Sequence, residues 1–370
     1  MQTVVEPVST KRQLREFVKL PYALYRNDPN WVAQLMMDDM KKLDRAKHPF
    51  FKHAAAEFFI ARQGGKPVGR IVAIDDALWS ECYGEKAAYW GWFECMNDHA
   101  AAKALFDASS TWAKNRGCTR IIGPMSPNAN DIVGLLVKGF DEPPCIMMPY
   151  NPVFYENLVE GCGSRKWKDL IAWFIEDDRI PDRLEKIMPI VEKRGKFTVR
   201  TVNMKDFANE IKRARSVYNE FEKVNSIYTP FTEEEFEYTG KDLKIAIDPD
   251  LVLFAEVDGK PVGLSLGIPD MNVALKPARG RLFPFGIIKI LLAQRKIHRI
   301  RVLSMGVLKE YRKRGIDLSF YYHTYVNGLR KGYNSAELSW VEEDNIDMTN
   351  VAIRMKAKPY KTYRVYERAL

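Results

Sequence analysis

Short runs of apolar residues alternate with polar ones along the chain, and one such pattern occurs twice. In each half, two apolar runs are separated by a glycine-containing turn, Gly64-Gly65 in the first and Asp258-Gly259 in the second. Asp-Gly between two apolar runs is a strong signal for a β-hairpin. The pattern therefore predicts two hairpins, with strands at 58–62 and 68–74 and at 252–257 and 262–266.

The two hairpins belong to a longer internal repeat. Both turns carry the sequence Gly-Lys-Pro-Val-Gly, at 65–69 and 259–263, and two further landmarks recur at nearly the same shift. Thr3 corresponds to Thr198 and Trp167 to Tyr360, so the three shifts are 195, 194 and 193 residues. A constant shift predicts one fold encoded twice. We expect domains at 1–178 and 196–370, joined by a linker at 179–195.

The elements after each hairpin also correspond. Each copy continues with a strand, a helix ending near a glycine, a further strand and a closing strand, which predicts a mixed α/β sheet. Pro181-Asp182 is typical of a helix start, so a linking helix is expected at 183–193, with Pro189 bending it or cutting it short. The expected segments are 88–94, 99–116 and 119–123 in copy one, and 300–307, 318–331, 335–341 and 363–368 in copy two. A Pro/Gly-rich loop is expected at 123–152.

Composition limits the class of protein and of partner. The 370 residues carry a net charge of +9, which favours an anionic partner such as a nucleotide, a nucleic acid or a membrane surface. The start of the chain lacks the features of a signal peptide, and no apolar run is long enough to span a bilayer. The five cysteines contain no C-x-x-C spacing and the five histidines are scattered. These features predict a cytoplasmic protein without a metal site.

The junction between the strand and the helix of copy two carries the strongest chemical signal. The chain turns there on Gly315, directly after Arg312, Lys313 and Arg314, and a helix is expected to begin at once. Amide groups at a helix start have no partners within the helix, and the helix dipole makes that end electropositive. Glycine lets the backbone approach a ligand closely. This junction is therefore predicted to bind a pyrophosphate.

At this junction the sequence resembles the GCN5-related N-acetyltransferase (GNAT) superfamily. The family's acyl-CoA loop is R/Q-x-x-G-x-G/A, and Arg312, Gly315 and Asp317 occupy its three defined positions. Asp317 departs from the small residue of the family, although aspartate readily caps a helix. The resemblance implies two GNAT-like domains in tandem and binding of acetyl-CoA or another acyl-CoA at 312–317, Ile316 included. It also implies transfer of the acyl group to the amine of a small molecule or peptide.

The resemblance also implies roles around this loop. A backbone N–H near Gly306 or Val307 would stabilise the oxyanion. Asn345 matches the start of the family's closing segment, but Ala352 stands where the family often has an acid tyrosine, so that role is not carried over. The corresponding turn of copy one, 93–98, contains neither glycine nor cation. Copy one is therefore interpreted as a degenerate domain.

Carboxylates and amides near the expected site supply the remaining candidates. Glu343, in the acidic cluster after the strand 335–341, is predicted to be the general base. Two pairs are predicted to bind the acceptor, namely Asp270 with Asn272 and Asn130 with Asp131. Each has a structural alternative: a solvated strand end for Glu343, turn chemistry for Asp270 and Asn272, and a tolerated loop insertion for the other pair.

The segment 285–301 is apolar on one side and basic on another. Nine Lys or Arg residues and no Asp or Glu lie between 271 and 309. Three interpretations remain open for it: contact with an anionic surface, cover for an acyl chain, or packing against the rest of the protein. Two functions compete with acyl-CoA-dependent transfer. One is aminoacyl transfer from tRNA, as in the FemABX enzymes, and the other is ligand binding without catalysis. The sequence does not define the oligomeric state.

Overall fold

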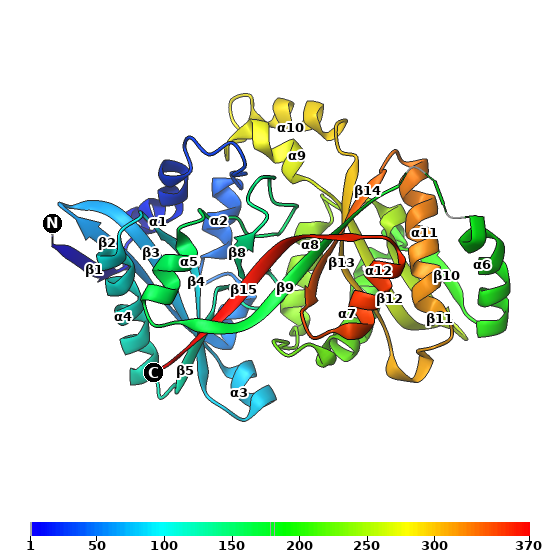
Figure 1. The fold of residues 1–370 in the computed structure, drawn as a ribbon, viewed down its shortest axis with the longest axis horizontal. Helices are drawn as coiled ribbons and strands as arrows, with labels where there is room; N and C mark the ends of the chain where they lie inside the picture. Colours follow the sequence, from blue (N-terminus) through cyan, green and yellow to red (C-terminus); the bar gives the residue numbers. More distant parts are fainter. Residues whose placement is uncertain (1, 178, 181) are drawn as a thin grey trace. The chain divides into compact units, whose positions relative to one another are not determined.

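The computed structural model describes residues 2–177, 179–180 and 182–370 and divides into two compact units (Figure 1). Unit 1 consists of Met1–Leu170, Leu275–Leu292 and Lys361–Leu370, and unit 2 of Ile171–Ala274 and Ala293–Tyr360. Each unit thus takes segments from both copies of the repeat. The boundaries expected from the repeat, 1–178, 179–195 and 196–370, are continuous in sequence, whereas the units are not.

Unit 1 is built on a mixed sheet in the order β1-β2-β3-β4-β5-β15, with β8 also pairing with β15. The predicted hairpin is β2 and β3, which pair antiparallel from Ala54↔Asp76 to Gln63↔Lys66. Its elements are β1 (Thr3–Pro7), α1 (Lys11–Leu24), α2 (Met36–Lys42), β2 (Ala54–Gln63), β3 (Lys66–Asp76), α3 (Ala77–Tyr83), β4 (Ala87–Cys95), α4 (His99–Asn115), β5 (Arg120–Gly123), β6 (Met125–Ser126), β7 (Ile132–Val133), β8 (Leu135–Lys138) and α5 (Tyr155–Gly161). Three elements begin or end in unit 2, namely α10 (Gly286–Gln294), β9 (Arg165–Glu176) and β15 (Lys358–Ala369), and α9 (Asn272–Leu275) lies in unit 2 except for its last residue.

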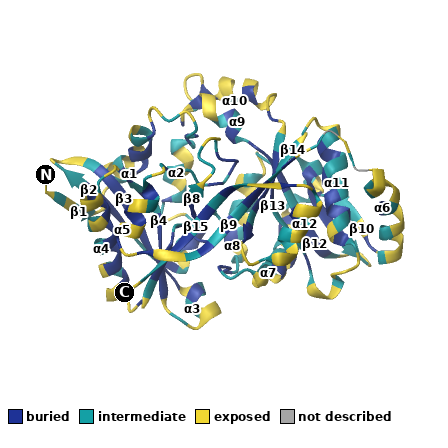
Figure 2. Ribbon diagram, in the orientation of Figure 1, coloured by how far each residue is buried: buried dark blue, intermediate teal, exposed yellow. Residues whose placement is uncertain are grey.

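The core of unit 1 lies between the sheet and α4. Asp98 caps this helix by accepting hydrogen bonds from the amides of Ala100 and Ala101, and the helix ends just before Gly117 as the sequence predicts. Its buried face carries Leu105 and Phe106, which pack in one cluster with Trp90 of β4. Figure 2 shows the corresponding buried stripes along the strands. Burial of these large side chains is the main stabilising contribution to the unit.

Unit 2 repeats the plan with the strand order β14-β13-β12-β11-β10. The second predicted hairpin is β11 and β12, which pair antiparallel from Val252↔Leu266 to Val257↔Lys260. The mixed α/β fold class predicted from the sequence is confirmed. Its elements are α6 (Asp182–Gly195), β10 (Thr198–Thr201), α7 (Phe207–Phe221), α8 (Glu233–Leu243), β11 (Val252–Val257), β12 (Lys260–Pro269), β13 (Arg299–Val307), α11 (Ile316–Arg330), β14 (Ser335–Glu342) and α12 (Ile346–Arg354).

Helices cover both faces of the unit 2 sheet. Successive residues of β11 belong to different clusters, because neighbouring side chains of a strand point to opposite faces. Phe254 packs with Phe221 of α7 on one face, whereas Leu253 packs with Phe320 of α11 on the other. The sheet is therefore buried on both sides, and a ligand has to enter at an edge or where strands separate.

The structure differs from the sequence prediction in two connecting segments. Pro189 does not cut the linking helix short: α6 continues through it to Gly195, and its second half packs against α11, where the Glu192 carboxylate binds Ser319 and His323. Pro181, expected at the helix start, lies outside the described residues. The loop expected at 123–152 contains three short strands: β8 pairs with β15 in the sheet of unit 1, and β6 and β7 pair with each other in a separate two-stranded sheet. Among the described residues, every helix is too short or too polar to cross a bilayer.

Candidate active site

The strands β13 and β14 separate halfway along their length. They pair in parallel from Arg299↔Ser335 to Val302↔Leu338, whereas β13 continues to Val307 and β14 to Glu342. The register between β12 and β13 shifts at this point, because Gly267 pairs with Val302 and Leu266 with Ser304. Leu303 is therefore the extra residue of a β-bulge, which bends a strand locally and increases its twist. The bulge coincides with the start of the gap between β13 and β14.

A carboxyl group with a raised pKa lies beside the gap. Glu222 follows the end of α7 and accepts hydrogen bonds from Ser304 Oγ, at 2.8 Å, and from the Asn225 amide. Burial raises the pKa of Glu222 to about 7, and the negative charge of Glu342 adds to the rise. A carboxyl group with a pKa near 7 is suited to accept a proton at neutral pH.

Glu342, the last residue of β14, is a second carboxylate at this position and is buried. Its Oε1 accepts hydrogen bonds from both the backbone N–H and the hydroxyl of Ser226, each at 2.9 Å. The adjacent residues Asn225 and Ser226 thus hold one carboxyl group each. Glu342 is 5% exposed, so its charge acts on Glu222 through a region of low polarity.

At Val307, the backbone N–H and carbonyl of β13 point toward the gap rather than toward β12. The N–H of Leu308 donates to the carbonyl of Val262 on β12, at 2.9 Å. Because the backbone groups of a strand alternate in direction, the N–H and carbonyl of Val307 face away from β12. Arg312 Nε donates to that carbonyl at 3.2 Å, which brings the first cation of the glycine turn to the same edge. The sequence prediction for Val307 agrees with this alternation, whereas the N–H of Gly306 faces β12.

The glycine turn leads directly into α11. Gly315 is the N-cap with φ of 86°, and the first backbone bond of the helix runs from Ser319 N–H to its carbonyl. The amides of Ile316 and Asp317 therefore precede the hydrogen-bond ladder of the helix and are free to bind an anion. The exposed side chains of this segment are Arg312, Lys313, Arg314 and Asp317.

Two features limit how an anion can approach this turn. A Cβ on Gly315 would lie 2.3 Å from Cγ1 of Val191, so α6 covers one side of the glycine. Asp317 is exposed, so its carboxylate lies in solvent rather than in the turn. The turn retains the amide and cation donors that a pyrophosphate requires. The glycine is needed for the contact with α6 as well as for its backbone conformation.

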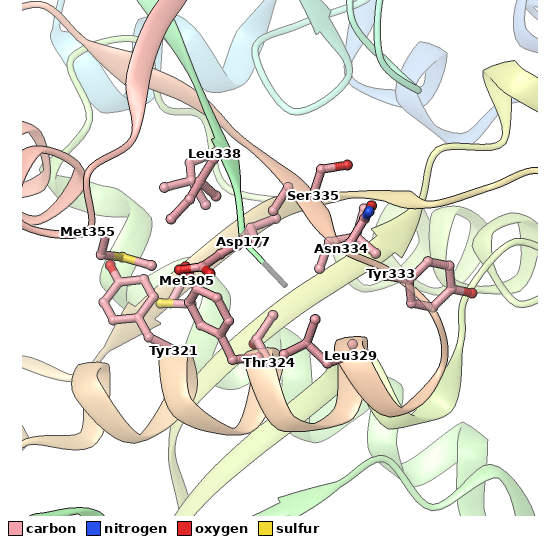
Figure 3. A pocket seen from close by; sticks show the side chains of 16 residues that line it. Asp177, Met305, Tyr321, Thr324, Leu329, Tyr333, Asn334, Ser335, Leu338 and Met355 are labelled. Carbon is pink, nitrogen blue, oxygen red and sulfur yellow. The ribbon is translucent and has the colours of Figure 1, made fainter. Parts of the chain in front are cut away.

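An apolar pocket with a cavity volume of about 50 Å³, partly open to solvent, lies beneath the start of the gap (Figure 3). Val302 and Leu338, the last residues at which β13 and β14 pair, both line it. Tyr321, Thr324 and Leu329 face it from α11 (Figure 3). The rest of the lining is Ile175, Asp177, Ile300, Met305, Tyr325, Gly328, Tyr333, Asn334, Ser335, Ala336 and Met355.

The other residues of unit 2 that were predicted to be functional lie in a turn, in a helix cap and in a buried ion pair. Glu343 lies in an exposed turn after β14, one residue beyond the buried Glu342. Asn345 caps α12 by accepting a hydrogen bond from Met348 N–H at 3.1 Å. Asp270 and Asn272 are buried, and the Asp270 carboxylate accepts two hydrogen bonds from Arg299 and one from the amide of Asn272. These contacts favour the structural alternatives named above, a solvated strand end for Glu343 and turn chemistry for Asp270 and Asn272.

Asn130 and Asp131 belong to unit 1. Asp131 forms an ion pair with Lys42 at 3.0 Å, and the backbone N–H of Asn130 donates to the side chain of Asn128. Asp131 thus connects the loop to α2, and Asn130 takes part in a contact within the loop. The residues around Glu222 belong to unit 2.

The corresponding gap of unit 1 is filled by the chain itself. The strands β4 and β5 pair only from Ala87↔Arg120 to Tyr89↔Ile122, and β4 continues beyond this pairing to Cys95. Beyond that point a Cβ on Gly91 would lie 1.8 Å from the carbonyl oxygen of Met125, and Trp92 N–H donates to Ser126 Oγ at 2.9 Å. The segment after β5 therefore occupies this gap.

Sequence reasoning missed Glu222, whose pKa of about 7 suits a group that accepts a proton. It selected Glu343 because that residue lies in an acidic cluster at a strand end, but no local signal marks Glu222, which is one of many acidic residues on amphipathic helices. Only the fold brings it to Ser304. Among the described residues, no cluster of three or more His, Cys, Asp or Glu side chains could hold a metal ion.

Two curated relatives match almost the whole chain. It is 35% identical over 378 residues to Protein YghO of Escherichia coli (strain K12), covering 100% of this chain and 96% of the relative. It is 36% identical over 377 residues to the bacterial ceramide synthase of Caulobacter vibrioides (strain NA1000 / CB15N), covering 99% and 97%. A scan against protein-family models finds no match.

Solved structures with the same fold are much more distant in sequence. A tandem GNAT protein from the clavulanic acid biosynthesis pathway, solved without AcCoA, aligns with a TM-score of 0.58 at 11% identity, covering 100% of this chain and 98% of the other. A GCN5-related N-acetyltransferase from Sphaerobacter thermophilus aligns with a TM-score of 0.53 at 14% identity, covering 99% and 95%. At such identities the likeness concerns the fold. The chain therefore belongs to the family of Protein YghO and the bacterial ceramide synthase, and its fold is that of the tandem GCN5-related N-acetyltransferases.

Proposed function

We propose that the protein transfers the acyl group of an acyl-CoA to the amine of a lipophilic acceptor, and that the reaction takes place in the gap between β13 and β14. The observation that carries this proposal is the position of Glu222, whose pKa is about 7, beside the point where the strands separate. The family fold, that of an N-acyltransferase, supports the reaction class.

Glu222 acts as the general base. An amine acceptor is mainly protonated at neutral pH and has to lose a proton before its lone pair can attack. The ionised Glu222 accepts this proton, and Ser304 and Asn225 fix the orientation of its carboxylate. Burial keeps the pKa of Glu222 close to the working pH, with a smaller contribution from charge repulsion by Glu342.

The edge of β13 stabilises the charge that develops during transfer. The amine nitrogen forms a bond to the thioester carbonyl carbon, the carbonyl oxygen becomes negative, and the N–H of Val307 donates to it. Breaking of the carbon–sulfur bond then releases the CoA thiolate, and the amide nitrogen loses its second proton. That proton leaves on the thiolate, so the products are an amide and free CoA. Ala352 supplies no acid here, so we assign no residue to this last transfer.

The glycine turn binds the CoA portion of the donor. The amides of Ile316 and Asp317 meet the pyrophosphate, and Arg312, Lys313 and Arg314 supply the positive charge. Arg312 also contacts the carbonyl of Val307, so it lies between the pyrophosphate site and the reacting carbonyl. This arrangement favours acyl-CoA over an aminoacyl-tRNA donor, which gives no reason for a pyrophosphate site at the turn.

In this proposal the pocket beneath the gap takes up the first carbons of an acyl chain longer than acetyl. Its lining is mainly aliphatic and aromatic, and burial raises the pKa of Tyr325 to about 12, so this hydroxyl stays neutral. One relative is named a ceramide synthase. A ceramide is the amide of a fatty acid and a long-chain amino alcohol, so that name is consistent with both the long acyl donor and the lipophilic amine proposed for this chain.

Only unit 2 carries the reaction in this proposal. The gap of unit 1 is filled by Met125 and Ser126, which leaves no space there for the pantetheine arm of CoA. This filling supports the interpretation of copy one as a degenerate domain.

The experiment is a thiol-release assay with acetyl-CoA and with long-chain acyl-CoAs, each tested with long-chain and short amines, followed by mass spectrometry of the product. We expect amide formation, highest with a long acyl chain and a long-chain amine. Replacement of Ala336 in the pocket lining by Phe should shift the preference to shorter acyl chains. CoA binding without turnover would support the non-catalytic alternative, and turnover only with aminoacyl-tRNA would support the FemABX-like one.

A further inference from the structure

A cluster of large apolar side chains is exposed on and just before α10. We call the segment 279–296 the basic apolar segment. Figure 2 shows α10 as largely exposed. The exposed fractions of its large apolar residues lie between 46% and 79%. These residues are Phe283, Phe285, Ile287, Ile288, Leu291 and Leu292.

The start of this segment is held by contacts with other residues of unit 1. Its apolar side chains are therefore exposed on a segment with a defined backbone. The carbonyl of Gly280 accepts a hydrogen bond from Met36 N–H at 3.1 Å, and a Cβ on Gly280 would lie 2.4 Å from the ring of Tyr22. Within the segment, Ile287 N–H donates to the carbonyl of Leu282 at 2.9 Å. A Cβ on Gly286 would lie 1.7 Å from the carbonyl oxygen of Arg281, so this turn is closely packed.

The charge of the segment identifies the kind of surface that fits it. Five Lys or Arg residues and no Asp or Glu lie between 279 and 296. Lys289 is exposed within the apolar helix itself, and Arg295 and Lys296 follow its end. Exposed aromatic and aliphatic residues combined with cations only are typical of segments that lie in the interface of an anionic membrane. A polypeptide partner would need acidic groups arranged for these cations, whereas anionic lipid headgroups supply negative charge at any position.

We propose that the basic apolar segment binds the surface of an anionic phospholipid bilayer. The apolar side chains enter the boundary between headgroups and acyl chains, and the cations contact lipid phosphates. The helix α10 has nine residues and is therefore about 14 Å long, which is too short to cross the hydrocarbon core. This inference does not depend on acyl transfer, because vesicle binding is measured without substrate.

The test is cosedimentation of the full-length chain with phosphatidylcholine vesicles, with and without phosphatidylglycerol. We expect binding only to the vesicles that contain phosphatidylglycerol, and weaker binding at high salt. The variant carrying both Ile288→Asp and Leu292→Asp should lose at least about tenfold in vesicle affinity. A milder variant with serine at both positions should also lose affinity. Lys289→Glu should weaken binding to the anionic vesicles.

Ile245→Asp is the matched control, because Ile245 is 88% exposed and lies outside the segment. It should bind vesicles like the original chain, and circular dichroism should give unchanged melting for all variants. Equal vesicle binding by the apolar variants and the original chain would overturn the proposal. Absence of binding to anionic vesicles would overturn it too. A homodimer that the same substitutions dissociate, without any vesicle binding, would show that the segment contacts a second copy instead.

Discussion

Ser304 of β13 donates a hydrogen bond of 2.8 Å to Glu222, two residues beyond the last position at which β13 pairs with β14. The bulge at Leu303 lies between the paired half of the strand and this contact. Beyond the bulge, where the strands are apart, β13 thus contacts the carboxyl group of the residue that follows α7. The fold therefore combines space for a substrate with a group that can take a proton.

Replacement of Glu222 by Gln should lower kcat about 10²- to 10⁴-fold, because glutamine cannot accept a proton. In the original protein kcat/KM should fall as the pH drops through about 7, since Glu222 then becomes protonated. The measurement is a pH profile of thiol release. Glu220→Gln is the matched control, because Glu220 precedes Glu222 by two residues and pairs only with the exposed Lys223 in the contacts described. A normal rate for Glu222→Gln would contradict the assigned role.

The raised pKa of Glu222 also predicts how stability depends on pH. The folded protein holds a proton on this group up to about pH 7, whereas the unfolded chain releases it near the ordinary value of 4.5. The folded state therefore binds more protons between these values, so the contribution of Glu222 to stability falls as the pH rises from 4.5 to 7. Glu222→Gln removes this loss of stability at higher pH, because glutamine does not titrate. The melting temperature of the variant minus that of the unsubstituted protein should therefore be larger at pH 8 than at pH 5. The same difference at both pH values would argue against a raised pKa of Glu222.

Reversal of one charge in the glycine turn should weaken binding of the donor. Arg312→Glu places a carboxylate beside the proposed pyrophosphate and removes the contact with the carbonyl of Val307. We expect KM for acyl-CoA to rise by about tenfold or more, with a smaller change in kcat. Lys260→Glu makes the same charge change at an exposed position in the hairpin turn and should leave KM unchanged. Isothermal titration with free CoA provides a second readout, and equal KM values for both variants would exclude the turn as the CoA site.

Alanine substitutions at two glycines with the same backbone conformation distinguish the cost of backbone strain from the cost of a steric clash with a neighbouring side chain. Gly315 and Gly332 both have φ of 86°, but only Gly315 faces Val191. Gly332→Ala should lower the free energy of unfolding by about 1–2 kcal/mol, the cost of the left-handed conformation for alanine. Gly315→Ala should cost more, and Val191→Ala in the same chain should restore part of the difference. Equal effects in urea titrations of the two single variants would mean that α6 is not packed on the turn.

Much of the fold was predictable because local patterns specify local structure. The Asp258-Gly259 turn and its flanking apolar runs predicted β11 and β12, and the predicted helix 99–116 corresponds to α4, whose Asp98 cap and following Gly117 are visible in the sequence. The glycine turn before α11 was placed correctly, because a strand end, a glycine and a helix start follow one another within a few residues.

The candidate base was not predictable in this way. Glu343 and Glu222 are both acidic residues at the ends of elements, and sequence alone gives no measure of their burial. Tertiary packing leaves Glu343 in solvent and places Glu222 against β13, where loss of hydration raises its pKa. The same limit applies to Asp270, whose partner Arg299 is 29 residues away in the sequence.

The sequence by itself determined the repeat, the mixed α/β class and most of the elements, because hydrophobic period, turn residues and caps act over a few residues. Tertiary structure decided which segments form each unit, that the gap of unit 1 is filled and that the gap of unit 2 has a carboxyl pair beside it. It also decided that the apolar residues of α10 remain exposed. These outcomes depend on contacts between residues far apart in the chain and on the hydration that those contacts remove, which local patterns do not specify.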